Sequence, residues 1–230
     1  MLELDAALLL SEILLALAFL QQSAEHMAGA RAERWLFAPR IVLSLALLAG
    51  WFVPCVLVGL VLHAVVLLHY FNGPYNGGSD KMGMLVLFCL SAAALLPEGP
   101  AQTAVFGYLG LQVVLSYFVS GWVKVANAEW RSGQALCEVF DYSAYPVSCQ
   151  LRRAAQQPRL MWLGSWVVIL FELAFPLGLL WEGVLLAMLV LGAVFHVVNG
   201  MLFGLNRFVW AWVASYPALV WLQGLLSGAV

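Results

Sequence analysis

Long runs of apolar residues follow one another along most of the chain, separated by short segments that hold polar residues, glycine or proline. A helix of about 20 apolar residues is long enough to cross a bilayer, so each run predicts a transmembrane helix. The expected spans lie at about 4–20, 35–50, 53–71, 82–96, 104–124, 160–180, 183–203 and 206–226. The pattern therefore predicts an all-α integral membrane protein, a single transmembrane domain over residues 1–230 built as a bundle of about eight helices.

The one long polar segment lies between the fifth and sixth runs, at about 125–159. Its first half, EWRSGQALCEVFDYS, mixes aromatic, small and charged residues, which is typical of a short helix that lies in the membrane interface. The remainder, up to PRLM, is expected to be a polar return toward the sixth span.

Composition agrees with a membrane solvent. The 230 residues are 64% hydrophobic and 10% charged, with a mean hydropathy of +0.94, whereas soluble domains are about 45–50% apolar and about 25% charged. About eight spans leave no room for a separate soluble catalytic domain. The ten basic residues are also too few and too scattered for a nucleic-acid partner.

The basic residues also predict an orientation. With eight spans, all ten fall in loops or span ends on one side, which the positive-inside rule makes cytoplasmic. Both termini are then extracytoplasmic, in a multi-pass protein of the inner (plasma) membrane. The N-terminal run carries Glu3 and Asp5 instead of a basic region, so it is interpreted as the first span and not as a cleavable signal.

The cysteine and histidine spacings do not predict a metal site. Cys137 and Cys149 share the polar segment, where a redox pair is the alternative to two free thiols, and no CxxC or Cys/His cluster is present. His63 and His69 are six residues apart, about 240° around a helix, so they do not share a face for haem. Glu-x-x-His pairs for a carboxylate-bridged metal are absent.

Four ionisable residues lie near the middle of the predicted spans: Glu12, His63, Glu172 and His196. Each costs about 3 kcal/mol to insert, so each needs a partner or a purpose. At the helical rise per residue, Glu172 is expected roughly 15–18 Å from the membrane edge at which Lys124 lies. One polar cluster would explain all of them. The alternatives are histidines bonded to backbone carbonyls and a Lys124 that reaches the headgroups.

Two segments carry further candidates. In YFNGPYNGGSDKM, Gly77 and Gly78 permit backbone angles that expose amides to an anion or a carbonyl oxygen. Asn76, Ser79 and Asp80 flank them and are expected to orient the head group of a bound substrate; an ordinary tight turn is the alternative.

In YFVSGWVKVANAEWRSG, Lys124 lies near Trp122 and Trp130. A lysine enclosed by aromatic rings can act as a base, whereas interfacial tryptophans alone would form an aromatic belt.

The segment YFVSGWVKVANAEWRSGQAL resembles the Y-F-x-x-G-x-x-K…W-x-x-G pattern of the HTTM family, the membrane portion related to vitamin K-dependent gamma-glutamyl carboxylase. FNGPYNGGSDKM, earlier in the chain, resembles a loop of bacterial HTTM proteins. FELAFPLGLL resembles a later span of the family, and FHVVNGMLFGLNRFVWAWVASYP resembles a carboxylase stretch with a histidine, an asparagine three residues on and then Leu-Phe. Together they cover roughly 70–220. The chain is thus similar to a small, stand-alone bacterial member.

The resemblance implies a chemistry and its residues. In the carboxylase a lysine at the position of Lys124, seven residues after Tyr117, deprotonates reduced vitamin K. His196 and Asn199 match a later histidine–asparagine pair, and Glu172 stands where the carboxylase has an acidic residue. The family implies Lys124 and His196 as catalytic residues, with Tyr117, Trp122, Trp130, Glu172 and Asn199 around the substrate.

Departures from the family pattern limit what is implied. The carboxylase has Asn-His-Ser where this chain has Gly77, Gly78 and Ser79, and its large lumenal domain has no counterpart here. The charge count places Lys124 on the cytoplasmic side, whereas carboxylase chemistry faces the lumen. Carboxylation of protein glutamate is therefore not predicted.

Three functions remain open at this point. The first is a protein that binds a quinone-like or isoprenoid lipid in the bundle. It would carry out base-catalysed redox or carboxylase/epoxidase-related chemistry with a reduced, vitamin K-like quinone and no metal. The second is a non-enzymatic anchor, maturation factor or subunit for another protein, for which a small thiol-disulfide-like protein of the DCC family is the expected partner. The third is a lipid or solute carrier.

Overall fold

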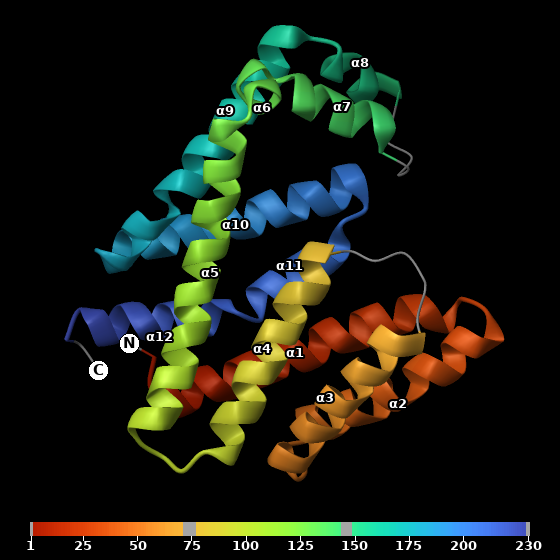
Figure 1. The fold of residues 1–230 in the computed structure, drawn as a ribbon, viewed down its shortest axis with the longest axis vertical. Coiled ribbons are helices and arrows are strands. Elements are labelled where there is room, and N and C mark those ends of the chain that lie inside the picture. The colour runs from red at the N-terminus through yellow and green to blue at the C-terminus, as the bar shows by residue number, and fades with distance from the viewer. Residues whose placement is uncertain (1, 71–76, 144–148, 229–230) are drawn as a thin grey trace. The chain divides into compact units, whose positions relative to one another are not determined.

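The computed structural model describes residues 2–70, 77–143 and 149–228, which form helices and no strand. Figure 1 follows them from red to blue along the chain. The helices are α1 (Leu4–Met27), α2 (Arg31–Leu48), α3 (Val53–Tyr70), α4 (Gly77–Leu95), α5 (Pro100–Ala126), α6 (Ala128–Ser132), α7 (Gln134–Tyr142), α8 (Cys149–Ala155), α9 (Pro158–Ala174), the 3-10 helix η1 (Phe175–Leu179), α10 (Glu182–Phe203), α11 (Asn206–Val213) and α12 (Tyr216–Leu226).

Seven stretches of these helices are long and apolar enough to cross a membrane: α1, α3, α4, α5, α9 with η1, α10, and α11 with α12. The prediction of an all-α membrane bundle is confirmed. The span expected at about 35–50 corresponds to α2, which is not among the seven. Its 18 residues include Arg31, Glu33, Arg34 and Arg40, and charges of this number make a span costly. The orientation of the termini depends on eight crossings and stays a prediction.

The chain divides into two compact units. The first comprises Met1–Leu111 and Arg207–Val230, the second Gln112–Asn206, and α5 runs from one into the other. In the first unit, α1 packs against α2, α4 and α12, while α3 packs against α2 and α4. Phe106 and Trp221 meet in its core with ring centroids 5.4 Å apart. The single domain expected over 1–230 stays a prediction.

In the second unit, prolines shape the helix that was expected at about 160–180. Pro158 occupies the first turn of α9, where its missing amide is not needed. Pro176 lies just after α9, and there the helix narrows into η1, because proline cannot donate the next hydrogen bond of an α-helix.

The polar segment contains three short helices instead of one. The α7 helix is amphipathic, and Phe140 on its buried face packs against Phe203 at 4.8 Å between ring centroids and lies in one cluster with Met161. Its opposite side exposes Tyr142. This pattern suits a helix at the membrane interface. The seven-residue helix α8 lies where the sequence predicted a polar segment returning to the sixth span.

All four cysteines are free. The Cys137 thiol donates to the Asp141 carboxylate, with Sγ 3.8 Å from Oδ2. Partial burial, followed by the negative charges of Asp141 and Glu138, raises the pKa of the Cys137 thiol.

Because the reactive species is the thiolate, we expect Cys137 to react slowly with a maleimide at pH 7 and faster as the pH rises toward its raised pKa. Asp141→Asn should speed labelling of Cys137 at pH 7, because removal of that negative charge leaves more thiolate, and leave that of Cys149 unchanged. The rates are measured by mass spectrometry in single-cysteine variants. If the labelling rate of Cys137 were the same with and without Asp141→Asn, the assigned effect of Asp141 on the Cys137 pKa would be wrong.

Candidate functional site

A buried ion pair joins α5 to α9. Lys124 Nζ donates to both carboxylate oxygens of Glu172, each at 2.7 Å, and to Ser120 Oγ at 2.8 Å. The two charged side chains are 15% and 3% exposed. Trp130 covers the ammonium, its ring centroid 5.2 Å from Nζ. Lys124 therefore points toward a carboxylate inside the second unit. A lysine that reached for lipid headgroups would point outward instead.

The ion pair depends on a close approach of the two helices at Gly121. A Cβ at this position would lie 2.9 Å from both Glu172 Cβ and the backbone nitrogen of Leu173. Only glycine lets α9 come this near. The glycine three residues before the lysine in the sequence pattern thus brings the acidic residue to the ammonium.

The α6 helix completes the surroundings of Lys124. Asn127 Oδ1 caps α6 by accepting from the Glu129 amide at 2.7 Å. The Ser165 hydroxyl donates to the Trp130 carbonyl, and Trp166 Nε1 donates to the Arg131 carbonyl at 3.1 Å. These bonds tie α6 to the first turns of α9 and hold Trp130 against the lysine.

The same contacts correct the expected depths. Counting from span boundaries placed Glu172 roughly 15–18 Å from the edge occupied by Lys124, yet the two side chains are in hydrogen-bond contact. The count was wrong because the first turns of α9, at Ser165 and Trp166, pack beside α6. Residues that were counted as membrane depth lie alongside α6.

A second buried polar pair joins α5 to α10. Tyr117 and His196 are 2% and 3% exposed, and the phenol oxygen lies 2.8 Å from His196 Nε2. Tyr117 stacks on Phe175 with ring centroids 3.9 Å apart, and Phe171 meets both rings edge-on. A phenol and an imidazole at this distance can share or pass a proton. Tyr117 lies two turns before Lys124 on the same helix.

Other residues predicted for this site take different positions. Trp122 is 60% exposed, so of the two predicted tryptophans only Trp130 covers Lys124. Asn199 is half-buried one turn after His196, and its carbonyl accepts from the Leu205 amide at the end of α10. His63 Nε2 lies 2.9 Å from the Leu36 carbonyl oxygen in the first unit, the backbone-bonded alternative. Glu12 also belongs to the first unit.

The glycine-rich segment also belongs to the first unit. Asn76 lies outside the described residues, and Gly77 and Gly78 begin α4 with ordinary helical φ angles. Ser79 is buried, and Asp80 Oδ1 accepts from Gln22 Nε2 at 2.9 Å. These residues therefore form the start of a helix and not a turn with unusual backbone angles.

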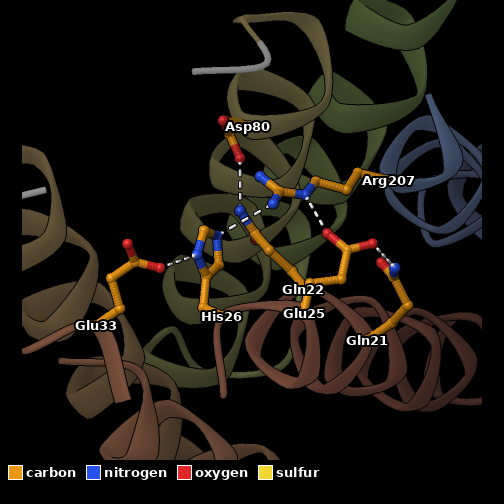
Figure 2. Close-up of polar contacts among 7 residues, drawn as sticks. All are labelled: Gln21, Gln22, Glu25, His26, Glu33, Asp80 and Arg207. Atoms are coloured by element: carbon orange, nitrogen blue, oxygen red, sulfur yellow. Dashed lines mark hydrogen bonds and ion pairs between the residues drawn. The ribbon is translucent and has the colours of Figure 1, made fainter. Parts of the chain in front are cut away.

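Around Asp80, α1, α2, α4 and α11 contribute a polar cluster that the sequence analysis missed (Figure 2). Its members are Gln21, Gln22, Glu25, His26, Glu33, Asp80 and Arg207. Arg207 Nε donates to Glu25 Oε2 at 2.8 Å, and its Nη2 lies 3.1 Å from His26 Nε2. Since arginine only donates, His26 Nε2 is the acceptor. Its Nδ1 then carries the proton toward Glu33 Oε2 at 3.2 Å.

A signal for this polar cluster was present in the sequence. Gln21 and Glu25, and likewise Gln22 and His26, are four residues apart at the end of the first apolar run. That spacing places each pair on one helix face. Arg207 lies 182 residues after Glu25, and no spacing in the sequence indicates that the two residues pair.

Comparison with known proteins gives one positive result. The family model described as HTTM domain matches residues 101–221, more than half of the chain. The matched region contains both buried pairs, Lys124 with Glu172 and Tyr117 with His196. No match was found among the curated proteins or among the solved structures.

Proposed function

The chain belongs to the HTTM family, and from this premise we propose that it is a multi-pass membrane protein that binds a reduced quinone-like or isoprenoid lipid and removes a proton from its hydroxyl group. The observation that carries the proposal is the buried Lys124–Glu172 pair. A buried ion pair is weak evidence for stability, so its presence within apolar helices favours a chemical role. The inner membrane and extracytoplasmic termini are the expected setting.

The geometry refines the assignment of the base. Lys124 donates to both oxygens of Glu172, so the lysine is a hydrogen-bond donor and the carboxylate is the acceptor. In the proposed step Glu172 takes the hydroxyl proton, while Lys124 keeps its charge and stabilises the oxyanion that remains. Tyr117 and His196 line the substrate and hold a second exchangeable proton. A reduced quinone, when bound, supplies the acidic hydroxyl and the electrons for reduction of dioxygen.

The first test is mass spectrometry of the organic extract from gently purified protein. We expect a near-stoichiometric quinone or isoprenoid lipid in the wild type and less of it in Lys124→Met. In lipid nanodiscs, added 1,4-naphthohydroquinone should then drive dioxygen uptake, with the quinol oxidised to quinone and dioxygen reduced to hydrogen peroxide. Lys124→Met and Glu172→Gln should each lower that rate by about 100-fold, as expected for a lost proton acceptor or its charged partner.

Matched controls are available in the same chain. Lys81 and Glu182 are exposed, so Lys81→Met and Glu182→Gln should leave lipid content and dioxygen uptake unchanged. Bulk phospholipid as the only lipid in every sample, with quinol oxidation independent of Lys124, would overturn the proposal. A co-purifying small thiol-disulfide-like protein would then favour the partner-subunit function, and lipid exchange between vesicles would favour the carrier.

A further inference from the structure

The first unit contains a cavity of about 420 Å³ between α1, α2, α3, α4 and α11. Its volume is in the range of small-molecule binding sites. One part of the wall is apolar, with Phe19, Leu67, Leu68 and Met84 among its residues. The polar part is formed by Gln22, Arg40, Ser79, Asp80 and Arg207. The cavity thus has the two-part wall that an amphiphilic molecule needs.

Arg40 is the decisive residue in this wall. Its side chain is 8% exposed, and its guanidinium lies 3.6 Å from the centroid of the Phe19 ring. Among the residues that the structure describes, Arg40 donates no hydrogen bond. A buried guanidinium whose five N–H groups lack acceptors is costly. The contact with the ring offsets part of the charge, and a bound oxyanion would satisfy the donors.

Among the described residues, the neighbouring groups leave the Arg40 guanidinium without a hydrogen-bond acceptor. Arg207 already donates to Glu25 and His26, and Asp80 already accepts from Gln22. The cavity wall holds two guanidinium groups and one carboxylate; Glu25 balances Arg207, and Asp80 attracts Arg40 without accepting a hydrogen bond from it. What this wall lacks is therefore an acceptor for the N–H groups of Arg40, which an oxyanion supplies.

From the buried, acceptor-free Arg40 in a cavity with an apolar wall, we propose that the first unit binds an amphiphile with one anionic head group, a carboxylate or a phosphate. The head group binds Arg40, with Arg207 nearby, and the hydrocarbon part packs on Phe19, Leu67, Leu68 and Met84. This site is separate from the Lys124–Glu172 pair, so each proposal can fail without the other.

The test compares ligands that differ in one feature. Binding of laurate, lauryl phosphate, lauryl alcohol and inorganic phosphate to the full-length protein is measured by isothermal titration calorimetry in nanodiscs of a zwitterionic lipid. We expect at least one of the two charged amphiphiles to bind about tenfold or more tightly than the alcohol. The better of the two identifies the head group. Inorganic phosphate alone should bind weakly, because it lacks the hydrocarbon part.

Variants of one helix provide the controls. Arg40→Met should remove the preference for the charged amphiphile, and Arg40→Lys should weaken it, because lysine keeps the charge without the planar donor fork. Arg34→Met removes an exposed arginine of the same helix and should change nothing. Thermal unfolding of each variant, with and without the better charged amphiphile, shows whether it is folded, and in folded Arg40→Lys the stabilisation by that amphiphile should be smaller than in the wild type.

Two outcomes would overturn the proposal. In one, the alcohol binds as tightly as both charged amphiphiles, or the better charged amphiphile binds folded Arg40→Lys and Arg34→Met with equal affinity. In the other, inorganic phosphate binds as tightly as the charged amphiphiles and depends on Arg40. The second result would make the cavity a site for a free oxyanion and not for an amphiphile.

Discussion

Replacing either partner of the buried ion pair, Lys124→Met or Glu172→Leu, is expected to lower the free energy of unfolding by about 3–5 kcal/mol. Each single substitution leaves one charge among apolar helices without the group that neutralises it. The double variant removes both charges and is expected to recover most of the loss, because two apolar side chains of similar volume can replace a buried ion pair at little cost. The coupling between the two sites should therefore be large.

The measurement is reversible unfolding in mixed detergent micelles, followed by circular dichroism. Lys81→Met and Glu182→Gln, at exposed positions, should change the free energy of unfolding by about 0.5 kcal/mol or less. Two single variants whose losses simply add in the double variant would contradict the pair as an energetic unit.

The double variant also separates stability from chemistry. If the pair has the proposed function, the double variant recovers most of the stability of the wild type but does not support quinol-dependent dioxygen uptake. A stable double variant with normal uptake would leave the pair with a structural role only.

Much of the fold was predictable because apolar length is a direct physical requirement of the bilayer. Five of the seven stretches that qualify were expected within four residues at each end, whereas α1 ends seven residues later and α4 begins five residues earlier than expected. The α2 helix differs, since apolar residues after Trp35 predicted a span while Arg31, Glu33 and Arg34 belong to the same helix. The break between α11 and α12, inside the run expected at about 206–226, also has no hydropathy signal.

The candidate site was predictable in its residues but not in its contacts. The spacing from Tyr117 through Gly121 to Lys124 places all three on neighbouring turns of one helix, and the resemblance drew attention to Glu172 and His196. Which of them pair follows from packing: Lys124 meets Glu172, and Tyr117 meets His196. Tertiary contacts of this kind depend on where α9 starts relative to α6, which periodicity does not encode.

The polar residues of the first unit were not predictable from the sequence as members of a site. Nothing but their charge distinguished Arg40 and Arg207 in the sequence, and charged residues near loops are ordinarily solvated. The structure places Arg40 in the wall of a cavity with its charge over Phe19. A helix that is short of apolar residues for a span, α2, is the helix that supplies this cation. The charged residues that make α2 unsuitable as a membrane span thus include the arginine of the polar cavity wall.

Gly133→Ala is expected to destabilise the second unit by about 2–5 kcal/mol, the sum of left-handed backbone strain and overpacking. Gly133 links α6 to α7 with φ +83°, a region that L-residues rarely adopt. An added Cβ would lie 2.5 Å from the backbone nitrogen of Trp162 and 2.7 Å from the carbonyl carbon of Met161. Backbone atoms cannot rotate away as a side chain can, so α6 and α9 must separate.

Two glycines of the same chain divide this effect into its parts. Gly50 has φ +67° with open space around it, so Gly50→Ala should cost only the backbone strain, about 1–2 kcal/mol. Gly183 has neither a positive φ nor a neighbour within 4 Å, and Gly183→Ala should be neutral or slightly stabilising. Reversible unfolding of the three variants gives the comparison. Equal losses in Gly133→Ala and Gly50→Ala would show that the contact with α9 contributes nothing. A larger loss at Gly133 means that the W-x-x-G pattern, from Trp130 to Gly133, holds α6 against α9 and thereby keeps Trp130 over Lys124.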